Sequence, residues 1–77
     1  MIVVEGDVIN NLKEAADWLR EAWICEPYNI YYEEIGKKDS EYYSEWISIE
    51  PVRGHEDMDS WDIWSLEEFE QFMRHGW

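Results

Sequence analysis

Residues 56–70 read EDMDSWDIWSLEEFE, and this stretch organises the chain. It carries seven carboxylates and no Lys or Arg. Apolar side chains are interspersed among these acids, namely Met58, Trp61, Ile63, Trp64, Leu66 and Phe69. The stretch can therefore pack against a core while its charges face solvent, which a disordered acidic tail does not do. We interpret it as part of a folded, negatively charged surface.

The second half of this stretch has the boundary signals of a helix. Ser65 precedes Glu68 by three positions, as in a capping box, and Gly76 lies where a C-cap is expected. The apolar side of this helix is predicted to consist of Leu66, Phe69, Phe72 and Met73, with Glu67, Glu68 and Glu70 toward water. Residues 60–64 alternate and predict a short strand, with Trp61 and Ile63 on one face and Asp62 and Trp64 on the other.

An apolar stripe at steps of three and four predicts another helix over residues 8–24. Asp7 or Asn10 is expected as its N-cap, and Pro27 is expected to end it. The β-branched residues 2–4 predict a first strand before this helix. The stripe consists of Ile9, Leu12, Ala16, Leu19 and Trp23.

Two longer runs predict an antiparallel pair of strands. Residues 29–35 are rich in aromatic and β-branched side chains, and residues 36–40 read GKKDS, which is typical of a turn. Residues 42–50 alternate, so Ile47 and Ile49 are expected to face the core, with Trp46 and Glu50 outward. The predicted order is β-α-β-β-β-α. This is a small α+β fold, one domain over residues 1–77, with helices packed on a mainly antiparallel sheet.

Composition predicts a core rich in aromatic side chains and a protein that resides in a reducing cellular compartment. Six Trp, five Tyr and two Phe supply apolar area in a chain of 77 residues. The one cysteine, Cys25, cannot form an internal disulfide, which is typical of a cytosolic protein. The first six residues, MIVVEG, contain neither the basic region of a signal peptide nor a membrane-spanning run. We therefore expect a cytoplasmic protein.

The charge is strongly negative, because nineteen acids oppose six Lys and Arg and give −13. Such a charge repels phosphate and anionic lipid, so we expect no direct binding to nucleic acid or membrane. Evenly scattered acids would lie about 16 Å apart on a folded surface of this mass. That exceeds the Debye length of about 8 Å in cells, so a strong field requires clustered acids. Composition alone leaves open whether the charge forms a functional face or only confers solubility.

The residue types used in catalysis and metal binding form no recognisable constellation. Asp57, Asp59 and Glu68 match positions 1, 3 and 12 of a calcium-binding loop, but Trp61 and Asp62 occupy positions 5 and 6, and position 6 requires Gly. The conventional nucleophile and base candidates are Cys25, His55 and His75. They are widely separated and show neither a nucleophile motif nor a zinc spacing. We expect no enzymatic activity, no metal site and no cofactor.

Acids beside outward-facing indoles favour a protein-binding surface. Trp46 and Trp64 could serve as apolar anchors, with the carboxylates steering a basic partner. Alternate residues on a strand lie about 6.6 Å apart, comparable to two steps of about 3.4 Å along a DNA strand, so carboxylates could replace phosphates in a basic groove. The predicted partner-binding residues are Glu33, Glu34, Glu45, Trp46, Glu50, Glu56, Asp57, Asp59, Asp62, Trp64, Glu67, Glu68 and Glu70.

In size, charge, lack of a cysteine framework and placement of acids between aromatics, the chain resembles small phage-encoded inhibitors of bacterial defence, especially anti-CRISPR proteins and anti-restriction DNA mimics. This resemblance is one of composition and includes no motif, so no functional residue is carried over. It implies a non-enzymatic, stoichiometric inhibitor that occupies the nucleic-acid channel of a CRISPR effector or nuclease in the cytoplasm of the infected or host bacterium. An immunity protein or antitoxin that neutralises a basic nuclease, and an acidic housekeeping interaction domain, remain as alternatives.

Overall fold

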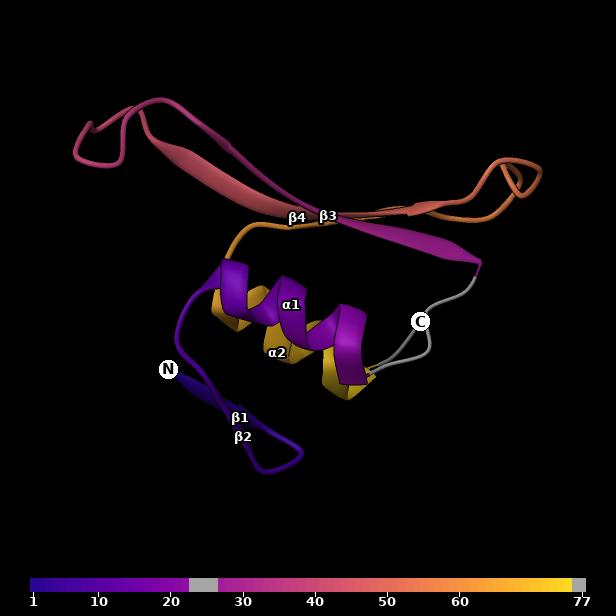
Figure 1. Cartoon of the computed structure of the whole chain (residues 1–77), viewed down its shortest axis with the longest axis horizontal. Coiled ribbons are helices and arrows are strands. Elements are labelled where there is room, and N and C mark those ends of the chain that lie inside the picture. Colours follow the sequence, from indigo (N-terminus) through magenta and orange to yellow (C-terminus); the bar gives the residue numbers. More distant parts are fainter. Residues whose placement is uncertain (23–26, 76–77) are drawn as a thin grey trace.

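Two antiparallel sheets and two helices make up the computed structural model, which describes residues 1–22 and 27–75 (Figure 1). The α+β class is therefore confirmed, and the structure has one strand more than expected near the N-terminus. The elements are β1 (Ile2–Val4), β2 (Asp7–Ile9), α1 (Leu12–Ala22), β3 (Tyr28–Ile35), β4 (Ser44–Pro51), β5 (Trp61–Ile63) and α2 (Leu66–His75).

The additional strand, β2, pairs with β1 in a hairpin with Val3 opposite Val8. Glu5 and Gly6 form the turn, and both have positive φ angles, 50° and 87°. A two-residue turn of this kind matches the twist of the flanking strands. The prediction that a helix starts at residue 8 is wrong, because Ile9 is buried in the core from a strand.

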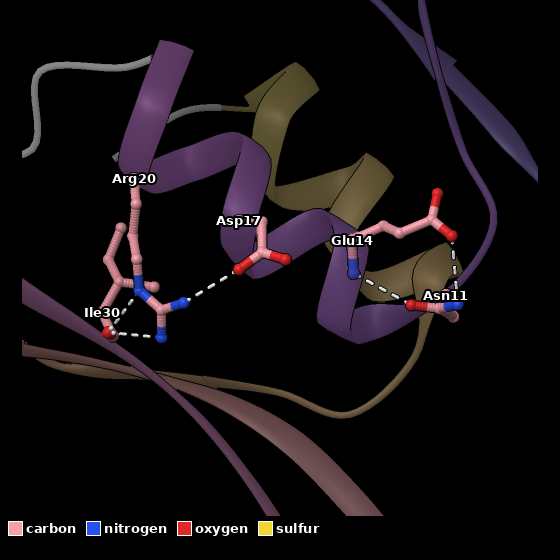
Figure 2. Close-up of polar contacts among 5 residues, drawn as sticks. All are labelled: Asn11, Glu14, Asp17, Arg20 and Ile30. Carbon is pink, nitrogen blue, oxygen red and sulfur yellow. Dashed lines mark hydrogen bonds and ion pairs between the residues drawn. The ribbon is translucent and has the colours of Figure 1, made fainter.

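Helix α1 instead begins after Asn11, which is the N-cap in place of the predicted Asp7 or Asn10. The backbone N–H of Glu14 donates to Asn11 Oδ1 at 2.9 Å, and Asn11 Nδ2 donates to Glu14 Oε2 at 3.2 Å (Figure 2). The cap thus satisfies one of the four N–H groups that lack a partner at the start of a helix. The predicted helical residues 23 and 24 lie outside the described residues.

The larger sheet has the strand order β3-β4-β5, and one of its faces carries the main core. Ile30, Ile47, Ile49 and Ile63 are buried on this inner face. Helices α1 and α2 lie side by side beneath the sheet, with the β1-β2 hairpin on their far side (Figure 1). The predicted inward direction of Ile47 and Ile49, and the outward direction of Trp46, are confirmed.

Aromatic side chains join the layers. Phe69 of α2 is fully buried, and its ring meets that of Trp18 of α1 edge to face at 6.3 Å between centroids. Trp61 of β5 packs between Tyr28 at 5.5 Å and Phe72 at 5.8 Å. The predicted cap of α2 is confirmed, because Ser65 Oγ accepts the Glu68 N–H at 3.1 Å. The predicted C-cap at residue 76 lies outside the described residues.

Arg20 ties α1 to β3, an edge strand of the larger sheet. Its Nε and Nη2 atoms donate to the carbonyl of Ile30 at 3.2 and 3.0 Å, and its Nη1 atom contacts Asp17 at 3.1 Å (Figure 2). A charged side chain that occupies a backbone group of an edge strand also hinders pairing with another chain.

Candidate functional site

The outer face of the β3-β4-β5 sheet points away from both helices, and no described element lies over it (Figure 1). Strand alternation brings side chains from all three strands to this face. In cross-strand register, Glu33 lies opposite Trp46, Tyr31 opposite Ser48, Asn29 opposite Glu50, and Ser48 opposite Asp62. Directly opposite residues have Cβ atoms about 4.5 to 5.5 Å apart, so these side chains form one contiguous surface.

Two indoles form the apolar centre of the outer face. The rings of Trp46 and Trp64 lie 4.9 Å apart between centroids with an interplanar angle of 31°. Trp64 retains 49% of its surface exposed, and Tyr31 on the neighbouring row retains 43%. Large exposed aromatics in one contiguous patch are typical of interaction sites rather than of an inert surface.

Carboxylates surround these rings without an opposing charge on the same strands. Glu33, Glu50 and Asp62 are exposed on the outer face, and β3, β4 and β5 contain no Lys or Arg. Ser48, which is buried between the outer strands, donates its hydroxyl to Glu50 Oε1 at 3.2 Å. The field of this face is therefore negative over an apolar centre, the combination that attracts a basic protein and then excludes water from the contact.

A second polar cluster lies where β3 ends and β4 begins, on the side of the sheet that faces α1. Tyr32 Oη donates to Glu45 Oε2 at 2.5 Å, and Tyr43 Oη donates to Glu34 Oε2 at 2.7 Å. These groups line an open cleft of about 580 Å³ together with Asn11, Lys13 and Lys38. Burial, followed by the hydrogen bond to Glu45, raises the pKa of the Tyr32 phenol, and the bond from Tyr43 lowers the pKa of the Glu34 carboxyl. The cluster holds two carboxylates in fixed positions within the fold.

The structure divides the predicted partner-binding residues among four places. Glu33, Trp46, Glu50, Asp62 and Trp64 come together on the outer face. Glu34 and Glu45 belong to the tyrosine cluster. Glu56, Asp57 and Asp59 lie in the β4-β5 loop, and Glu67, Glu68 and Glu70 lie on α2.

The acids of residues 56–70 thus do not share one surface, because loop, strand and helix point them in different directions. The loop extends past the end of the sheet, whereas α2 lies below it (Figure 1). Asp62 and Glu68 still line one shallow cavity of about 360 Å³ at the β5 edge. In the loop, the Gly54 N–H donates to Glu56 Oε1 at 3.0 Å and lowers the pKa of that carboxyl. Further acids lie on the hairpin and α1, namely Glu5, Asp7, Glu14, Asp17 and Glu21.

Two features of the site were missed by sequence reasoning. Tyr31 belongs to the outer face, and the alternation of β3 alone would have placed it beside Glu33. The tyrosine cluster also had a signal, because the pattern Tyr-x-Glu occurs twice, at 32–34 in β3 and at 43–45 where β4 begins. Alternation places each Tyr and its Glu on the same face, but only the strand register shows that the two pairs meet.

The described nucleophile and base candidates, His55 and His75, lie in different elements. His55 is exposed in the β4-β5 loop, His75 is exposed at the end of α2, and Cys25 lies outside the described residues. Within residues 1–22 and 27–75, no three His, Asp or Glu side chains are grouped so as to hold a metal ion. Over the same residues, no helix has the length and apolar character needed to cross a membrane.

No family model matches the chain, and neither a curated protein nor a solved structure matches it.

Proposed function

We propose that this protein is a non-enzymatic, stoichiometric inhibitor whose outer face docks into a basic nucleic-acid-binding groove of a partner protein. The observation that supports this proposal is the outer face itself, where exposed Tyr31 and Trp64 and half-buried Trp46 alternate with Glu33, Glu50 and Asp62. By displaying carboxylates where nucleic acid displays phosphates, such a face would fill the groove and displace its ligand.

Electrostatics favours a protein partner with a basic surface. The net charge of −13 opposes the approach of nucleic acid and of anionic lipid, but it accelerates the approach of a Lys- and Arg-rich protein. The rings supply the short-range part of the affinity, because aromatic side chains dominate interface energies once water is excluded. Within this proposal, a CRISPR effector or another nuclease of the bacterial cytoplasm is the expected partner, as the resemblance in composition implies.

Capture from a bacterial lysate tests the proposal when it is combined with charge-matched variants. The immobilised protein should retain nucleic-acid-binding proteins at low salt and release them at high salt, because salt screens exposed charges. The retained protein, once purified, should lose its bound DNA or guide RNA when one equivalent of the inhibitor is added.

Two double variants with the same net charge locate the binding face. Glu33→Lys with Asp62→Lys changes the outer face, whereas Glu5→Lys with Glu21→Lys changes the hairpin turn and α1. The first variant should abolish displacement, and the second should retain most of it. Equal losses in both variants, or capture that is indifferent to salt, would contradict the proposal.

A further inference from the structure

We propose that the outer face binds the guanidinium group of an arginine side chain, which stacks on the Trp46–Trp64 pair while its N–H groups donate to Glu33 and Asp62. This inference rests on the proposed function and specifies the residue by which the partner is recognised. The two indole rings face each other at 4.9 Å between centroids, and Trp64 keeps 49% of its surface exposed, so it offers an apolar ring to a ligand. Glu33 and Asp62 are sheet neighbours of this indole pair.

The positions of the two acids follow from the strand register. Glu33 is directly opposite Trp46 on the β3 side, and Trp64 continues β5 on the other side of Trp46. Asp62 precedes Trp64 by two residues, so both side chains point to the outer face at a spacing of about 6.6 Å. Glu33 is therefore the neighbour of Trp46 across the strands, and Asp62 is the neighbour of Trp64 along its own strand, so each indole has one carboxylate next to it.

These two carboxylates are also the unoccupied acceptors of the sheet. Glu34 and Glu45 accept phenolic hydrogen bonds, and Glu50 accepts one from Ser48. For Glu33 and Asp62 the described structure contains neither a hydrogen bond nor an ion pair. Their full hydrogen-bonding capacity is available to a ligand, beside a tryptophan that is half exposed.

The chemistry of the face favours arginine over other ligands. A guanidinium group is planar, stacks on indole and donates from its edge to carboxylates, whereas an ammonium group is compact and strongly hydrated. A nucleobase could stack on the same rings, but surfaces that bind single-stranded nucleic acid place Lys and Arg between the rings, and β3, β4 and β5 contain neither. The occupant that satisfies both the rings and the acids is an arginine of a protein.

Hexa-arginine and hexa-lysine peptides of equal charge provide the test. Isothermal titration should show hexa-arginine binding to the unmodified protein about two- to five-fold more tightly than hexa-lysine, the range expected for one exposed cation–π contact. Trp64→Ala should abolish this preference and leave the binding of hexa-lysine nearly unchanged. Tyr42→Ala is the matched control, because Tyr42 is 80% exposed and lies in the turn before β4 rather than in a strand of the sheet.

A second variant keeps both indoles. Glu33→Gln with Asp62→Asn should lower the arginine preference while the indole N–H resonances of Trp46 and Trp64 stay dispersed in the NMR spectrum. Equal affinity of the unmodified protein for both peptides, or a preference that survives Trp64→Ala, would overturn the arginine site and leave the proposed function standing. If neither peptide discriminates between the Glu33→Lys/Asp62→Lys and Glu5→Lys/Glu21→Lys variants, the acidic face itself fails, and the proposed function fails with it.

Discussion

Replacing Arg20 by Met should lower the free energy of unfolding by about 1.5 to 2 kcal/mol, since Arg20 joins α1 to the edge of the sheet. Its Nε and Nη2 atoms donate to the carbonyl of Ile30 at 3.2 and 3.0 Å, and its Nη1 atom contacts Asp17 at 3.1 Å. Met retains most of the apolar stem, so the change removes the donors and the charge while preserving much of the packing.

The hydrogen bonds to Ile30 and the ion pair with Asp17 contribute unequally to this loss of stability. A hydrogen bond from a charged donor is worth about 1.5 to 3 kcal/mol, and both bonds share one acceptor, so we count them once, at the lower end of that range. The side chains of Arg20 and Asp17 are 44% and 54% exposed, so their ion pair adds only about 0.3 kcal/mol. For a domain of this size, the loss corresponds to a fall in Tm of about 6 to 16 °C.

Urea unfolding followed by tryptophan fluorescence measures the effect against two controls. Arg74→Met removes the same charge from a side chain that is 67% exposed and lies 3.8 Å from Glu70, and it should change stability by less than about 0.5 kcal/mol. Asp17→Asn removes only the ion pair and should cost a few tenths of a kcal/mol. Arg20 does not join α1 to the sheet edge as described if Arg20→Met costs no more stability than Arg74→Met, or if Asp17→Asn costs as much as Arg20→Met.

Three further predictions concern the core, the pH dependence and the indole pair. Phe69→Ala should cost about 3 to 5 kcal/mol, a large part of the stability of about 4 to 12 kcal/mol expected for this length, and should weaken the near-UV circular dichroism. The raised pKa of Tyr32 favours the protonated phenol in the fold, so its contribution to stability is complete below the unfolded pKa of 10.0 and is lost as pH rises above it; Tyr32→Phe should reduce the fall of the urea midpoint at alkaline pH. Two indoles 4.9 Å apart couple electronically, so Trp64→Phe should remove an exciton couplet contributed by Trp46 and Trp64 to the far-UV circular dichroism spectrum.

Local sequence signals were sufficient to predict an element where its own residues determine its boundaries and its buried face. Helix α2 has a cap at Ser65 and an apolar side that buries Phe69, and both were predicted. The alternation of β4 likewise gave the inward direction of Ile47 and Ile49. In these cases, one periodicity dominates the segment, and tertiary contacts reinforce it.

The prediction of a helix from residue 8 is wrong because a helical and a strand periodicity overlap in the N-terminal segment. Ile9 continues the helical stripe of Leu12 and Ala16, but it also belongs to the β-branched pair Val8-Ile9. The hairpin turn at Glu5-Gly6 decides in favour of the strand, because Gly6 readily adopts positive φ and the resulting pairing buries Ile9. A Glu-Gly turn is a weaker sequence signal than Asn-Gly or Asp-Gly.

The distribution of the acids over the surface could not be predicted without the tertiary structure. The spacing of residues 56–70 was compatible with one acidic face, but that face would have required loop, strand and helix to share a surface. The outer face was recoverable in part, since alternation identified Trp46 and Trp64 as outward. The contact of these two indoles, and the contribution of Glu33 from β3, depend on which strands are neighbours and in what register.

The placement of the indoles separates a stabilising role from a binding role. Trp61 and Trp64 are three residues apart, and Trp61 faces the core between Tyr28 and Phe72. Trp46 is half-buried in the central strand β4, so part of its surface contributes to the fold. Stability accounts poorly for Trp64, which keeps 49% of its surface in solvent after folding. An indole left half exposed beside unpaired carboxylates contributes more to a contact that forms later than to the fold, and a Trp64→Ala variant that folds normally but loses its partner would show that directly.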